Sequence, residues 1–166
     1  MFDTGAYQSL AEFSIALSGF VGLVVAFRRR EGRFHPADDF RIFIALVPSL
    51  AGAFLALLPV ALDLLVLEPS TTLMLSSVTY AAVVLLLLVL IAIRTRRLPP
   101  DARAVLSRPL TVFFYALLGS SVAANFLNAL SFFGTPSSGV YFLGIMAILV
   151  NSATVFARIV FIRPAA

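Results

Sequence analysis

Residues Thr71–Arg97 read TTLMLSSVTYAAVVLLLLVLIAIRTRR, an apolar run that ends in a cluster of arginines. The apolar part, Thr71–Ile93, exceeds the ~20 residues that a helix needs to cross ~30 Å of hydrocarbon. Such near-continuous apolar sequence excludes the short alternating segments of a membrane β-barrel. The stretch therefore predicts a membrane-spanning helix with one positively charged end.

The rest of the 166-residue chain is similarly apolar. Hydrophobic residues make up 61% of it and charged residues only 12%, and the mean hydropathy is +1.04. A water-soluble domain of this length could not bury so much apolar surface. The sequence predicts an all-α integral membrane protein, a single domain over residues 1–166 with no soluble domain. Its five transmembrane helices are expected at about residues 6–27, 40–67, 71–93, 110–133 and 139–162.

All twelve basic residues are arginines, and they share one side of the predicted membrane. The connections Glu68–Ser70 and Gly134–Ser138 on the other side hold none. The positive-inside rule then predicts an outer N-terminus and a cytoplasmic C-terminus, and the composition suggests a bacterial inner membrane. Because these arginines sit at helix ends, the net charge of +4 indicates contact with anionic lipid headgroups and not with nucleic acid. The arginines are Arg28, Arg29, Arg30, Arg33, Arg41, Arg94, Arg96, Arg97, Arg103, Arg108, Arg158 and Arg163.

The second run, Phe40–Leu67, is unusually long and contains Pro48 and Pro59. A proline lacks the N–H that would bond the carbonyl four residues earlier, so the carbonyls of Ile44 and Leu55 lose their helical partners. One interpretation is a tilted, kinked helix. The other is an interrupted helix whose freed backbone contacts an ion or substrate.

Stripes of small and polar residues indicate where membrane helices pack or where water enters. The first run carries such a stripe, formed by Gly5, Gln8, Glu12, Gly19, Gly22 and Ala26. The third run is smooth and aliphatic over Val83–Ile93. We therefore expect the third helix at the lipid-facing periphery and the other four around the interior.

Ionisable and amide side chains give the candidate ion or proton path. Glu12 lies about two turns inside the first helix, where a carboxylate costs up to ~3 kcal/mol on insertion scales. Asp63 and Asn128 have similar depth by residue count, so the three are expected to form an outward-facing cluster with Gln8 above it. Glu12 is interpreted either as a cation or proton site or as a protonated packing residue, and Asp63 either as part of the cluster or as an interfacial residue.

Three further polar residues extend the candidate path inward. Asn125 and Asn151 lie in the middles of the fourth and fifth helices, where amides either bond across helices or line a path. Arg158 lies about one turn from the inner end, where it either extends to the headgroups or acts as an inner gate or anion contact.

Several chemistries lack the residues they need. The only histidine, His35, falls in a predicted loop, and the chain has no cysteine and no lysine. A serine nucleophile in the helices would have no histidine base, and no Schiff base can form. The sequence predicts no enzyme activity, no cofactor and no metal site.

Two functions remain. The first is a small channel or transporter, cation- or proton-selective through Glu12, that works as a homo-oligomer because five helices hardly enclose a wide path alone. The alternative is a non-transporting subunit or scaffold that packs its Gly/Ala faces against a partner membrane protein.

Overall fold

The computed structural model describes residues 4–30, 36–104, 106–132 and 134–161, and these residues form helices and connections without a strand. Five of the helices are long and apolar enough to cross a membrane. The shortest, α5, has 22 residues, which is about 33 Å of helix. The predicted all-helical chain with five such helices is confirmed. The helices are α1 (Thr4–Arg30), α2 (Pro36–Asp63), α3 (Pro69–Arg97), α4 (Pro100–Ala104), α5 (Arg108–Ala129) and α6 (Ser138–Phe161).

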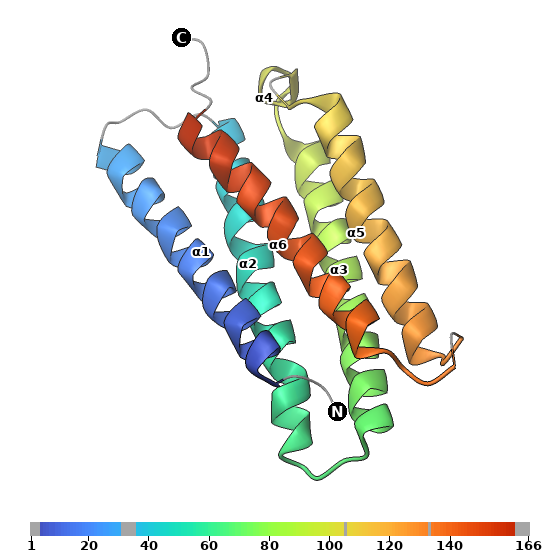
Figure 1. Cartoon of the computed structure of the whole chain (residues 1–166). Coiled ribbons are helices and arrows are strands. Elements are labelled where there is room, and N and C mark those ends of the chain that lie inside the picture. The colour runs from blue at the N-terminus through green and yellow to red at the C-terminus, as the bar shows by residue number, and fades with distance from the viewer. Residues whose placement is uncertain (1–3, 31–35, 105, 133, 162–166) are drawn as a thin grey trace.

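Four of the long helices form a closed bundle, and the fifth packs on its outside (Figure 1). Around the bundle, α2 contacts α3, α3 contacts α5, α5 contacts α6, and α6 returns to α2. Helix α1 packs mainly against α2 and more weakly against α6. Helices α2 and α3, and likewise α5 and α6, are therefore direct neighbours in the bundle.

The expectation that the third long helix is peripheral is wrong. Helix α3 buries a regular face that includes Tyr80, Val84, Leu87 and Ile91, and it is α1 that lies outside the ring. The reason is physical: lipid is as apolar as a protein core, so a smooth aliphatic sequence can face either one.

Two helices end earlier than their apolar runs. Helix α2 ends at Asp63, where the N–H of Leu65 bonds to Leu62 O and Val66 takes a φ of 57°. Helix α5 ends at Ala129, and Ser131 has a φ of 55°. Both residues with a left-handed backbone reverse the chain within apolar sequence. A prediction from hydropathy alone therefore placed the helix ends beyond these turns.

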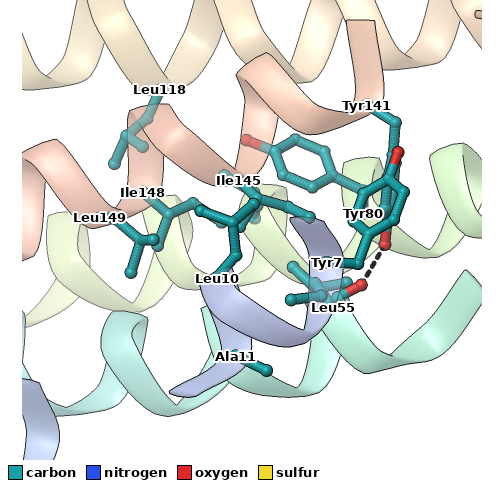
Figure 2. Close-up of a cluster of buried hydrophobic side chains, with 12 residues drawn as sticks. Tyr7, Leu10, Ala11, Leu55, Tyr80, Leu118, Tyr141, Ile145, Ile148 and Leu149 are labelled. Atoms are coloured by element: carbon teal, nitrogen blue, oxygen red, sulfur yellow. Dashed lines mark hydrogen bonds between the residues drawn. The ribbon is translucent and has the colours of Figure 1, made fainter. Parts of the chain in front are cut away.

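Helix α2 is continuous through Pro48 and Pro59, so the interrupted-helix interpretation is wrong. The carbonyl of Leu55, which Pro59 deprives of its helical donor, accepts a hydrogen bond from the hydroxyl of Tyr141 on α6 (Figure 2, dashed line). A side chain from the neighbouring helix thus replaces the missing backbone N–H.

The arginines that the structure describes lie at one end of the bundle, where α1, α3 and α6 finish and α2 and α5 begin. We call this the arginine end. Arg103 of α4 donates to the carbonyls of Arg96 at 2.6 Å and Leu98 at 3.2 Å, which caps the end of α3. Three residues of the sequence analysis, Arg33, His35 and Arg163, lie outside the described residues.

Candidate functional site

Three of the seven candidate path residues lie on the surface of the protein. Gln8 and Glu12 are exposed on α1, and Asp63 is exposed at the end of α2. Asn128 is instead buried on α5, which is not one of the helices against which α1 packs. The structure therefore does not bring Glu12 and Asn128 together in one polar cluster.

The small and polar stripe of α1 is an uncovered face. We name it the α1 stripe, and every one of its members is exposed: Gly5, Gln8, Glu12, Gly19, Gly22 and Ala26. A Cβ atom placed on Gly19 or Gly22 would meet nothing within 4 Å. Gln8 and Glu12 stand one helical turn apart, and neither bonds to another part of the chain that the structure describes. The face has a polar half near the start of α1 and a smooth half toward the arginine end.

Asn128 is a structural residue that joins α3, α5 and the segment before α6. Its Nδ2 donates to Ser77 Oγ at 3.0 Å and to the carbonyl of Ser137 at 3.1 Å. Its Oδ1 accepts the N–H of Ser137 at 2.7 Å. With both of its amide hydrogens and its oxygen engaged, this side chain fixes the α5–α6 connection.

Three buried tyrosines form a layer that the sequence analysis missed (Figure 2). The Tyr141 ring centroid lies 5.9 Å from that of Tyr7 and 6.0 Å from that of Tyr80. Each hydroxyl donates to a backbone carbonyl: Tyr7 to Ser138, Tyr80 to Gly144 and Tyr141 to Leu55. Pro59 was the available signal, because a carbonyl freed inside a membrane needs a donor from elsewhere.

Gly144 allows α3, α5 and α6 to approach one another at this layer. A Cβ atom there would clash with Nδ2 of Asn125 and would lie 2.9 Å from Cζ of Tyr80. The hydroxyl of Tyr80 is 2.7 Å from the Gly144 carbonyl and 2.8 Å from Ser121 Oγ. The absence of a side chain at residue 144 therefore makes room for the Tyr80 hydrogen bond.

Two amides in the middle of the bundle have unused bonding capacity. Nδ2 of Asn125 donates to the carbonyl of Ser121 at 3.1 Å, but its Oδ1 has no partner among the described residues. Asn151 is only 1% exposed, and within the described chain both its Nδ2 and its Oδ1 lack a partner. Because most buried side-chain polar atoms are hydrogen-bonded, Asn151 needs an explanation.

Asn151 lines a partly open cavity of ≈ 70 Å³ between α2, α3, α5 and α6. Arg158, the last candidate path residue, lines the same cavity and is half-buried. Arg41 also contributes, but its guanidinium is 3.3 Å from the buried carboxylate of Asp38. Much of the remaining wall is apolar and includes Ile44, Leu88, Ile91, Leu110, Phe114 and Val155. The cavity extends from the arginine end toward the centre of the bundle.

The described residues include no group of three or more His, Cys, Asp or Glu side chains that could hold a metal ion. The chain matches no protein-family model, no curated protein and no solved structure. The α1 stripe and the cavity are the two candidate functional features of the described residues.

Proposed function

We propose that this chain is a small membrane channel or transporter that works as a homo-oligomer, with the α1 stripes of its copies facing one another. The observation that carries the proposal is the exposed Glu12 carboxylate on a helix long and apolar enough to cross a membrane. An ionisable group at membrane depth almost always faces protein or water. A second copy packed on α1 would shield Glu12 from lipid, and a shared path would keep it in water.

The form of the α1 stripe supports contact between copies. Gly19, Gly22 and Ala26 offer a smooth surface on which two helices can approach closely. At the other end of the stripe, Gln8 and Glu12 would bring several carboxylates and amides around a common axis. Rings of acidic side chains favour cations in channels, so Glu12 would select cations or protons.

The arginines support an orientation with the arginine end in the cytoplasm and the start of α1 outside. Glu12 then lies in the outer half of the membrane, near the entrance of the path. A bacterial inner membrane is the proposed location. Asp63, at the outer end of α2, would face the external solution, and Asn125 and Asn128 would hold the bundle together.

The test is ion flux into vesicles that contain the purified protein, measured with K⁺ and with protons. Replacing Glu12 by Gln should lower cation flux by about tenfold, the effect of ~1.4 kcal/mol on the barrier. Asp63→Asn is the matched control, because it removes an exposed carboxylate at a helix end, and its flux should equal that of wild type. Equal flux from Glu12→Gln and wild type would remove Glu12 from the path.

If the chain is instead a scaffold, the α1 stripe would contact a partner membrane protein and not other copies of this chain. If α1 packs against a partner membrane protein, the purified chain should be monomeric in lipid nanodiscs and should carry no flux. Native mass spectrometry of the nanodiscs gives the number of copies directly. A ring of several copies supports the shared path, and a silent monomer overturns it.

A further inference from the structure

One face of α6 presents a polar group and a cation to the same cavity. Asn151, Val155 and Arg158 follow one another at steps of four and three residues, and all three line the cavity. Seven residues are almost two helical turns, so Asn151 and Arg158 share a face and stand about 10 Å apart along the helix. Asn151 lies at the deep end, and Arg158 lies toward the arginine end.

Both of these side chains have bonding capacity that the protein leaves unused. Asn151 offers an amide donor and a carbonyl acceptor, and neither has a partner in the described part of the chain. The side chain of Arg158 forms no hydrogen bond or ion pair with any described residue. The second arginine at the cavity, Arg41, is neutralised by Asp38. Among the described residues that line the cavity, Arg158 is therefore the arginine whose charge no carboxylate balances.

The space between the two groups suits an apolar chain. Ile44, Leu88, Leu110 and Phe114 line it from α2, α3 and α5. A cavity of ≈ 70 Å³ is several times larger than the 10–15 Å³ that one water molecule requires. Mostly apolar walls with a few polar groups that fix orientation are typical of small-molecule sites.

We infer that the cavity binds an amphipathic organic anion. Its carboxylate or phosphate pairs with the guanidinium of Arg158, and its aliphatic body lies along the apolar wall. A hydroxyl or carbonyl group at the far end bonds to the carboxamide of Asn151. This chemistry fits a soluble hydroxy acid as well as the acidic headgroup of a lipid. The inference concerns equilibrium binding and does not depend on the proposed flux.

Native mass spectrometry of the full chain, released from detergent micelles, can count bound ligands. The probes are 8-hydroxyoctanoate, octanoate and octanol, which differ in one functional group at a time. Wild type should bind one 8-hydroxyoctanoate per chain, more tightly than octanoate, and octanoate about tenfold more tightly than octanol. Equal binding of octanoate and octanol would overturn the inference.

Two variants and a control assign the contacts. Arg158→Gln should abolish the preference for octanoate over octanol, whereas Arg97→Gln, an exposed arginine at the same end, should keep it. Asn151→Leu should abolish the preference for 8-hydroxyoctanoate over octanoate. Because Asn151→Leu fills a buried position, Asn151→Ser is a second variant in case Leu prevents folding. If Arg97→Gln and Arg158→Gln lose the preference for octanoate over octanol to the same extent, that preference comes from surface charge, and the proposed site is overturned.

Anionic phospholipid distinguishes the two sources of ligand. Phosphatidylglycerol that stays bound to wild type, is lost in Arg158→Gln and is displaced by 8-hydroxyoctanoate identifies a lipid headgroup as the natural occupant. Binding of the hydroxy acid without retained phosphatidylglycerol identifies a soluble acid. Binding of neither probe overturns the inference.

Discussion

At the scale of single residues, Tyr141 makes a proline tolerable near the C-terminal end of α2. Pro59 removes the donor for the Leu55 carbonyl, and no water is present in a membrane core to replace it. The hydroxyl of Tyr141 supplies the missing hydrogen bond. All three tyrosines of this layer make a bond of this kind: a hydroxyl on one helix donates to a backbone carbonyl of another helix.

Replacing Tyr141 by Phe should lower the free energy of unfolding by about 1–3 kcal/mol, because it leaves a buried carbonyl unsatisfied. The measurement is reversible unfolding in mixed micelles. Tyr115→Phe is the matched control, since no hydrogen bond ties the Tyr115 hydroxyl to any described residue, and it should change the unfolding free energy little.

The link to Pro59 can be measured by a double-mutant cycle. In a Pro59→Ala background, the new N–H of residue 59 bonds the Leu55 carbonyl, so Tyr141→Phe should cost less than it does in wild type. Equal costs in the two backgrounds would show that Tyr141 does not compensate for the proline.

The sequence marked the amides as candidate polar residues within the helices and missed the tyrosines. Asn125, Asn128 and Asn151 are all buried, and Asn128 bonds to Ser77 and Ser137 in place of the expected cluster with Glu12. Glu12 is not turned into the bundle, because the helix that carries it lies outside the ring. Pro59 indicated that the Leu55 carbonyl needs a donor, but the tyrosine layer as a whole could not be predicted, since it depends on which carbonyl each hydroxyl meets across helices.

At the scale of helices, glycines that look alike in sequence differ in what surrounds them. A Cβ atom on Gly144 would meet Asn125 and Tyr80, whereas one on Gly119 would meet nothing within 4 Å. Gly144→Ala should therefore destabilise the protein by about 1–3 kcal/mol through overpacking. Gly119→Ala should be neutral or stabilising by up to ~1 kcal/mol, because alanine favours helix. Unfolding of both variants in micelles checks this, and equal stabilities would contradict the close packing at Gly144.

Hydropathy predicted the helices well but not their neighbours. All five long apolar runs form helices. Which of α1 and α3 lies outside the ring could not be predicted from the sequence, because a buried face and a lipid-facing one are equally apolar. Glu12 did not distinguish the two surfaces either, since it lies on the exposed face of α1.

At the scale of the whole molecule, the two candidate sites lie on different parts of the fold. The cavity is inside the ring of α2, α3, α5 and α6, and none of the described side chains of α1 lines it. The α1 stripe faces away from the helices against which α1 packs. In the proposed homo-oligomer, each protomer would therefore hold its own ligand while α1 contacts other copies, and changes to the stripe should leave the cavity intact.

This separation allows the assembly to be tested without disturbing the bundle. Gly19→Leu and Gly22→Leu place a large side chain on an open face, so each protomer should keep its wild-type unfolding free energy within about 0.5 kcal/mol. In nanodiscs, both variants should shift the oligomer toward monomers, because the added side chains prevent close approach of the α1 helices. Ala123→Leu, on the exposed face of α5, is the control and should keep the wild-type number of copies. If wild type is an oligomer that both glycine variants preserve, α1 is not its interface, and Glu12 must be covered by something other than a second copy of this chain.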